Sequence, residues 1–294
     1  MKIESIIVNE LSATNFRNPN NIKQLRSKNG VNVYRIYLDD KSYVVKYFEK
    51  DEYKREIQMY KLLRDIGVKT LEIYESTNNL IVMEDIMISD RYRLGVEKDL
   101  SDLDVAKGLA VWYKDFHEKG LKYLKDNKDI KLYKELDYIT IDTINTVKVK
   151  SYTESSFVWN SLISNIDIIK KKINMLPQTL NYNDFYYTNL IVSKDKKEAF
   201  MFDFNFMGQG LKYFDVRNVL YSLKGEAKQI FLEEYGEYDI KEKLVDDVMS
   251  VIYDLSKAYG KDIFPKWGEE SLGKINDVSF EKNVSSMIDL LLEN

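Results

Sequence analysis

Short runs of hydrophobic residues, separated by polar turns, recur along the first ninety residues, as they do in strands. This pattern predicts strands over residues 33–38 and 42–48, joined by a polar turn, and a third strand over 80–86. A helix is predicted over 52–65, because Tyr53, Glu56, Tyr60 and Leu63 follow one another at steps of three and four. The N-terminal part is therefore expected to be mostly β with one helix.

From about residue 89 the pattern becomes helical. Ser101–Asp104 is typical of a capping box, and Val105, Leu109, Trp112 and Phe116 form the stripe that follows it. Further helices are predicted over 156–174, from Asp215 onward, over 244–255 and over 284–291. The C-terminal part is therefore expected to be mainly helical.

A predicted hairpin near the middle of the chain brings polar side chains together. Its two apolar runs, 190–192 and 199–202, flank a charged turn. Asp184 and Asn189 come just before the first run and Asp203 just after the second, so all three are expected at one end of the hairpin. Such oxygen-bearing side chains suit Mg²⁺, with one carboxylate left to act as a base. The alternative is a hairpin whose turns are simply capped by Asp and Asn.

Two charged residues fall at positions expected to be apolar. Lys46 lies within a strand of Val and aromatic residues, and Glu56 lies on the apolar stripe of the helix that follows. A buried charge needs a partner, so the simplest arrangement pairs Lys46 with Glu56. Otherwise Lys46 points to solvent and Glu56 lies on a solvated helix flank.

Composition narrows the classes of function. The net charge of −4 and the pI near 5.4 argue against a nucleic-acid partner. The chain has no Cys, which excludes disulfides and thiol chemistry, and its single His makes His-dependent triads improbable. That residue, His117, is expected to be structural on the flank of an amphipathic helix.

No signal peptide or membrane-spanning run is recognisable, so a cytoplasmic protein without a membrane partner is expected. Residues 225–294 contain 16 Asp or Glu against 8 Lys. These charges either form a solvated surface or line a site for a cationic ligand.

The order of these residues resembles that of a known family. Asp184 precedes Asn189 by five positions, and Asp203-Phe204 follows the hairpin, as in kinase catalytic and metal-binding elements. Together with Lys46 and Glu56, this resembles the aminoglycoside phosphotransferase and choline kinase-like family of small-molecule kinases. Asn205 in place of Gly, and the short connection through Gly208 and Gly210 to Asp215, resemble that family more than protein kinases.

The resemblance implies a role for each residue. Asp184 would be the catalytic base, and Asn189 and Asp203 would hold Mg²⁺. Lys46, oriented by Glu56, would contact the phosphates of ATP or GTP. Gly30 and its neighbours, in a stretch that reads as flexible, would cover those phosphates, and the backbone from Glu84 to Ile86 would meet adenine.

The resemblance also implies a fold. It predicts an α+β, bilobal protein-kinase-like structure, with a small antiparallel β lobe containing one helix over residues 1–88 and a larger helical lobe over 89–294. One position departs from the family, because Tyr182 stands where a His is usual, two residues before Asp184.

The expected function is ATP-dependent phosphorylation of a hydroxyl on a small molecule by a monomer or dimer. An aminoglycoside-type acceptor is favoured by the acidic C-terminal region. The alternatives are a choline, ethanolamine or other metabolite kinase, and a non-catalytic kinase-like binding protein.

Overall fold

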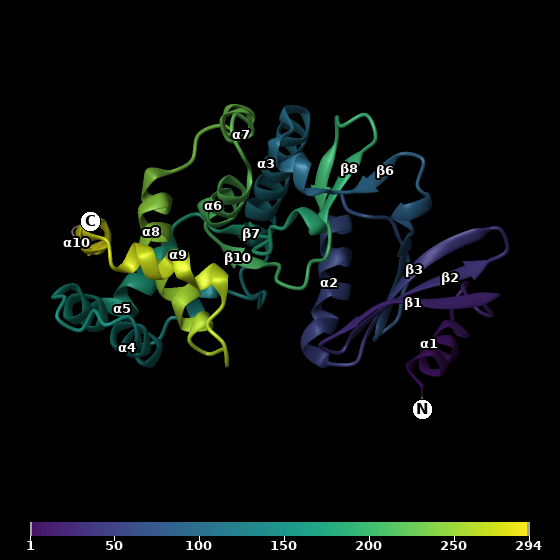
Figure 1. The fold of residues 1–294 in the computed structure, drawn as a ribbon, viewed down its shortest axis with the longest axis horizontal. Helices are drawn as coiled ribbons and strands as arrows, with labels where there is room; N and C mark the ends of the chain where they lie inside the picture. The colour runs from purple at the N-terminus through teal and green to yellow at the C-terminus, as the bar shows by residue number, and fades with distance from the viewer. Residues whose placement is uncertain (1, 293–294) are drawn as a thin grey trace. The chain divides into compact units, whose positions relative to one another are not determined.

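A computed structural model describes residues 2–292, which divide into two compact units, each built from several segments of the chain (Figure 1). The first unit runs as far as Lys119 and adds Asp184–Met207 and Leu220–Tyr235. The second comprises Gly120–Asn183, Gly208–Val219 and the chain from Gly236 onward. The predicted boundary between two lobes, after residue 88, does not coincide with this division into units. It stays a prediction.

The first unit contains a five-stranded antiparallel sheet in the order β1-β2-β3-β5-β4. Its strands are β1 (Asn21–Lys28), β2 (Val31–Leu38), β3 (Lys41–Phe48), β4 (Ile73–Ser76) and β5 (Leu80–Glu84). The predicted strands 33–38, 42–48 and 80–86 are confirmed as β2, β3 and β5, although β5 ends at Glu84. Strand β1 escaped prediction because its residues are almost all polar and exposed, so no alternation marks it.

Two helices cover opposite faces of this sheet. Helix α1 (Ile3–Leu11) packs Ile7 and Leu11 against a face that includes Val45. Because neighbouring residues of a strand point to opposite faces, Lys46 points to the other face, where Glu56 of α2 (Asp51–Asp65) meets it. The prediction of a single helix in this region was therefore wrong, since α1 is a second one.

The predicted central hairpin is present in the first unit as β8 (Leu190–Ser193) and β9 (Ala199–Met201). With β6 (Tyr92–Leu94) it forms a three-stranded sheet in the order β6-β8-β9. Helix α3 (Leu103–Asp126), as far as Lys119, and helix α7 (Ala227–Tyr235) also belong to this unit.

The start of α3 differs from the expected capping box. The side chain of Asp102 accepts the backbone N–H groups of Asp104 and Val105, so Asp102 rather than Ser101 caps the helix. On α3, His117 is almost fully buried, and its Nδ1 shares a 2.8 Å hydrogen bond with Tyr235 Oη of α7. This contact gives His117 a structural position between the two helices.

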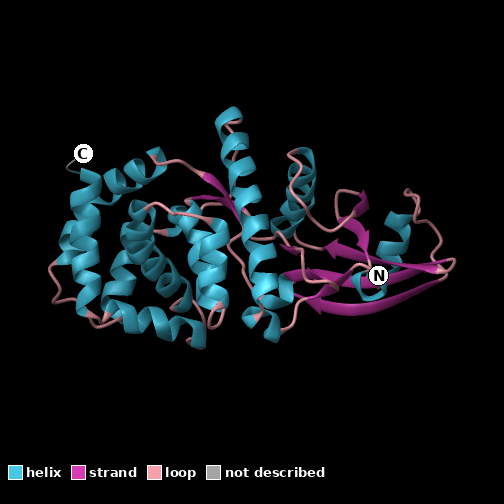
Figure 2. Cartoon of the chain, turned by 90° about the horizontal axis from the view of Figure 1, so that it is seen from above, coloured by secondary structure: helices cyan, strands magenta, loops and turns pink. Residues whose placement is uncertain are grey.

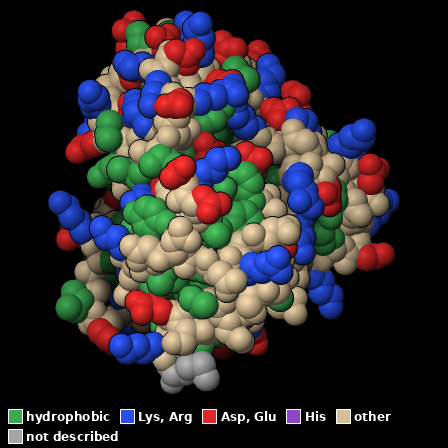
Figure 3. Space-filling view, turned by 90° about the vertical axis from the view of Figure 1, so that its right-hand side faces the viewer, with side chains coloured by type: hydrophobic (Ala, Val, Ile, Leu, Met, Phe, Trp, Pro, Cys, Tyr) green, Lys and Arg blue, Asp and Glu red, His purple; other side chains and the backbone are tan. Residues whose placement is uncertain are grey.

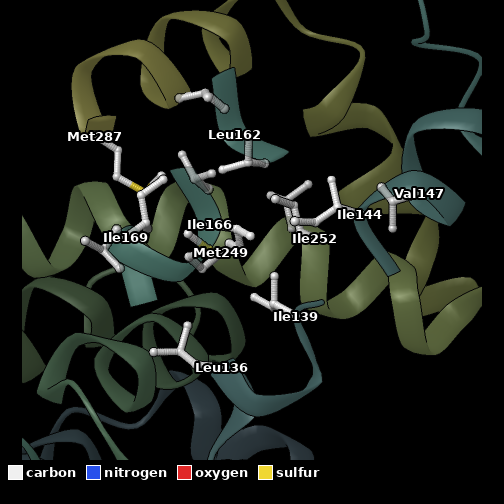
Figure 4. Packing of buried hydrophobic residues seen from close by; sticks show 14 of the residues in the cluster. Leu136, Ile139, Ile144, Val147, Leu162, Ile166, Ile169, Met249, Ile252 and Met287 are labelled. Carbon is white, nitrogen blue, oxygen red and sulfur yellow. The ribbon is translucent and has the colours of Figure 1, made fainter. Parts of the chain in front are cut away.

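The second unit is mainly helical (Figure 2). Leu162, Ile166 and Ile169 of one helix meet Met249 and Ile252 of another in its core (Figure 4). The short strands β7 (Thr179–Asn181) and β10 (Gly208–Gly210) pair antiparallel. Its helices are α4 (Ile141–Lys150), α5 (Val158–Met175), α8 (Ile240–Ala258), α9 (Lys266–Ile275) and α10 (Val278–Leu292), together with α6 (Lys212–Ser222) as far as Val219.

The face shown in Figure 3 carries acidic and basic side chains interspersed around a group of hydrophobic ones. Of the helices formed by residues 2–292, none is both long enough and apolar enough to cross a membrane.

Candidate active site

The β8–β9 hairpin brings Asn189 and Asp203 to the same end of the sheet. Its register pairs Leu190 with Met201, and one step further out the Phe202 N–H donates to the Asn189 carbonyl at 3.0 Å. Helix α3 packs tightly against this hairpin at Gly108, where a Cβ would lie 2.9 Å from the Ala199 nitrogen. Helix α3 therefore supports the hairpin near its turn, at the end opposite Asn189 and Asp203.

Lys46 contacts two carboxylates. Its Nζ lies 2.6 Å from Glu56 Oε2 and 2.9 Å from Asp203 Oδ1. The predicted contact between Lys46 and Glu56 is present, and Asp203 joins it from the hairpin. The side chain of Glu56 is fully buried and that of Lys46 is 9% exposed, so this ion pair is shielded from water.

The pKa values of Lys46 and Glu56 follow from the sharing of one ammonium group by two carboxylates. Burial lowers the pKa of Lys46, but the charges of Glu56 and Asp203 outweigh burial and raise that pKa above its usual value. Burial raises the pKa of Glu56 to about 7, with the charge of Asp203 adding to the rise and the Lys46 ammonium opposing it. The site therefore keeps Lys46 protonated and brings the carboxyl groups of Glu56 and Asp203 close together.

Asp184 and Asn189 form a second contact. The Asn189 side-chain amide donates to Asp184 Oδ2 at 3.0 Å and to the Asp184 carbonyl at 3.2 Å. Burial, followed by the charge of Asp203, raises the pKa of Asp184 to about 6 despite that hydrogen bond and the Lys46 charge. A carboxylate with a raised pKa close to the operating pH is suited to general base catalysis.

Asp203 is held in a constrained backbone conformation. Its φ is 65°, in the left-handed region that non-glycine residues seldom adopt. The Asp203 N–H donates to Tyr60 Oη at 3.3 Å, and the Tyr60 ring packs edge-on against Phe204 with 5.0 Å between ring centroids. No sequence pattern indicated that Tyr60 supports Asp203, because Tyr60 appeared only as one more aromatic residue on an apolar helix stripe.

In the second unit, the segment that leads into Asp184 is fixed by Asp215. The fully buried Asp215 carboxylate accepts the backbone N–H of Tyr182 at 2.8 Å and that of Asn183 at 2.9 Å. Asn183 also has a positive φ of 65°. The sequence suggested that Asp215 suits the first turn of a helix, and it does lie there in α6. Its carboxylate, however, accepts hydrogen bonds from the backbone of the segment that ends at Asn183.

The predicted nucleotide-contacting positions are separate from these contacts. Gly30, with φ of 85°, forms a two-residue turn with Asn29 between β1 and β2. The expected flexible stretch is therefore a tight hairpin turn, because Asn-Gly favours the two positive φ values that such a turn requires. The Glu84 N–H donates to the Glu72 carbonyl, and the Ile86 carbonyl accepts from the Ser89 N–H. Nucleotide binding by Gly30, Glu84 and Ile86 stays a prediction.

Few side chains are available to bind a metal ion, and those available offer oxygen atoms, which are hard ligands. Nowhere in residues 2–292 do three or more His, Cys, Asp or Glu side chains gather as a metal site. Asn189 and Asp203 nevertheless suit Mg²⁺, which keeps several waters and is held by one or two protein ligands together with substrate phosphates. Because the Asn189 amide nitrogen points to Asp184, its oxygen is left for a cation.

The second unit also contains a charge cluster around the buried Asp246 that sequence reasoning missed. Arg217 Nε lies 3.0 Å from Asp246 Oδ2, and burial raises the pKa of Asp246 to about 7. Burial together with Asp254, Asp246 and Asp215 raises the pKa of Glu135 to about 8, while the charge of Arg217 opposes this. These residues are scattered over the chain without a shared motif, so no sequence pattern connects them.

Comparison with protein-family models and with curated sequences finds no match. Solved structures do match. Choline kinase LicA from Streptococcus pneumoniae is 15% identical, with 97% of this chain and 99% of that chain covered and a TM-score of 0.59. A choline/ethanolamine kinase family protein from Mesorhizobium loti is 11% identical, with the same coverage and a TM-score of 0.65.

A third similar structure is the GDP complex of a variant of an aminoglycoside 2′-phosphotransferase-IIIa. It is 12% identical, covers 100% of this chain and 97% of its own, and has a TM-score of 0.58. The chain has the fold of these small-molecule kinases. The predicted α+β, protein-kinase-like fold class is thereby confirmed.

Proposed function

We propose that the protein transfers the terminal phosphoryl group of ATP or GTP to a hydroxyl group of a small molecule. The observation that supports this best is the meeting of Lys46 with Glu56 and Asp203, on the unit where Asp184 contacts Asn189. Lys46 supplies a fixed positive charge for nucleotide phosphates. Phosphoryl transfer depends mainly on such positioning and charge stabilisation.

In this proposal Asp184 orients the acceptor hydroxyl and takes its proton. The acceptor oxygen then forms a bond to the terminal phosphorus while the bond to the bridging oxygen breaks, which releases the nucleoside diphosphate. Asn189 and Asp203 would hold Mg²⁺, which when bound neutralises phosphate charge. The raised pKa of Asp184 supports this role, since a carboxylate of ordinary acidity would be a weaker base.

The acceptor we propose carries positive charge, with an aminoglycoside-type molecule as the first candidate. The acidic balance of residues 225–294, 16 Asp or Glu against 8 Lys, supports this choice, because negative charge attracts cations. A choline- or ethanolamine-type amine is the second candidate, because the faces of two tyrosine rings, Tyr138 and Tyr253, contact the ammonium group of Lys257 in the second unit.

A panel assay tests the proposal. Release of ADP or GDP would be measured with Mg-ATP or Mg-GTP and aminoglycosides, choline, ethanolamine, homoserine or simple sugars. We expect turnover with one class of amine. Nucleotide binding without turnover of any acceptor would support the non-catalytic alternative, and absence of nucleotide binding would refute both.

The pKa of Asp184 predicts how activity depends on pH. With acceptor limiting, kcat/KM should fall about tenfold per pH unit below pH 6, because the protonated carboxyl cannot accept a proton. The same raised pKa means that this group's contribution to stability is present below the unfolded-state pKa of about 4 and is lost as pH rises through about 6. Rates between pH 5 and 8, beside unfolding curves at each pH, would separate the two effects. A flat profile over this range would contradict the assignment of Asp184.

A further inference from the structure

Three tyrosine rings lie close together in the second unit. Tyr133 and Tyr138 come from the segment before α4, with 5.6 Å between their ring centroids and 50° between their planes. Tyr253 of α8 lies 6.1 Å from Tyr138 at 77°, and its hydroxyl is hydrogen-bonded to that of Tyr133. The ring planes are inclined to one another, and the faces of Tyr138 and Tyr253 are turned toward a common cation. We call Tyr133, Tyr138 and Tyr253 the tyrosine cage.

The tyrosine cage already holds a cation of the chain itself. Lys257 follows Tyr253 by one helical turn on α8, so both lie on the same face of that helix. Lys257 Nζ is 3.1 Å from the centre of the Tyr138 ring and 5.4 Å from that of Tyr253. Both distances are within the range of a cation–π interaction.

Lys257 has no salt bridge to hold it there. Among residues 2–292, no carboxylate lies within ion-pair distance of Lys257 Nζ. Burial lowers the pKa of Lys257, and the negative charge of Glu135 opposes that effect. The ammonium is therefore held mainly by the faces of the Tyr138 and Tyr253 rings. Another organic cation can replace both interactions.

Glu135 lies near both the tyrosine cage and the charge cluster around Arg217. It lies between Tyr133 and Tyr138 in the sequence, and Asp215 and Asp254 both contribute to its raised pKa. Asp215 in turn holds the N–H of Asn183, the residue immediately before Asp184. Within the second unit, the cage and the segment that ends at Asn183 therefore lie near the same group of charged side chains.

We propose that the tyrosine cage binds an organic ammonium group and that Lys257 occupies it, as a tethered substitute, when that ligand is absent. Lys257 then sets specificity, because only a ligand whose ammonium interacts better with the rings than Lys257 does can enter. Naming this ligand the phosphoryl acceptor rests on the proposed function, whereas cation binding to the cage does not.

Calorimetric titration with choline, without any nucleotide, tests the proposal. We expect Lys257→Met to bind choline at least about tenfold more tightly than the wild type, because the competing ammonium is removed. Adding Tyr138→Ala to Lys257→Met should abolish the gain. Lys241→Met, an exposed position on the same helix, is the matched control and should bind as the wild type does.

The neutral isostere 3,3-dimethylbutan-1-ol distinguishes cation binding from simple filling of a cavity. It should bind no better to Lys257→Met than to the wild type. Equal choline affinity in the wild type and Lys257→Met, or an equal gain for the neutral isostere, would overturn the proposal. Lys257→Gln provides a second variant if the Met variant fails to fold. Since no phosphoryl transfer is measured, these results stand apart from the panel assay.

Discussion

Replacing Asp184 by Asn should lower kcat by about a hundred- to ten-thousandfold, the range expected when a general base is removed. The amide keeps the size of the side chain and can still hydrogen-bond to Asn189, but it cannot take up the proton of the acceptor hydroxyl. Initial rates with saturating Mg-ATP and the acceptor found in the panel assay measure this effect.

Stability provides the control for Asp184→Asn. Burial and Asp203 make the ionised Asp184 carboxylate unfavourable in the folded protein, so a neutral amide should leave the free energy of unfolding at pH 8 unchanged or raise it. Asp90→Asn, at an exposed position of the same unit, should alter neither rate nor stability. A rate within about threefold of the wild type in Asp184→Asn would show that Asp184 is not the base.

Sequence reasoning succeeded where a local pattern would be energetically unfavourable without a specific partner. Lys46 and Glu56 were singled out because a charge on an apolar strand or stripe must find a partner, and the structure places them 2.6 Å apart. The hairpin with Asn189 and Asp203 at one end followed from two apolar runs around a charged turn. In both cases residues close in sequence carried the whole signal.

The parts that escaped prediction depend on contacts between distant segments. Arg35 and Ser42 both hydrogen-bond the buried Asp85, yet Asp85 follows a strand where a polar residue is ordinary. Lys257 reads as a solvated residue of an amphipathic helix, and only the fold brings Tyr138 beneath it. Such partners are chosen by tertiary packing, which a single sequence does not record.

Lys46→Met should impair both nucleotide use and folding. Loss of the fixed ammonium should lower kcat/KM for Mg-ATP by about a hundred- to a thousandfold, as for the loss of one preorganised charge-stabilising donor. It also leaves Glu56 fully buried beside Asp203 without its cation, which should lower the free energy of unfolding by about 3–5 kcal/mol. Urea unfolding and initial rates measure the two effects separately.

The double variant Lys46→Met/Glu56→Gln separates these roles. Neutralising Glu56 removes the buried, unpaired charge, so most of the lost stability should return, while kcat/KM should stay as low as in Lys46→Met. Lys41→Met, at an exposed position of β3, controls for loss of a lysine from this strand. If Glu56→Gln restored neither quantity, the instability would come from lost packing around Lys46. If it restored both, the Lys46 ammonium would have no direct part in using the nucleotide, and its contacts with Glu56 and Asp203 would be purely structural.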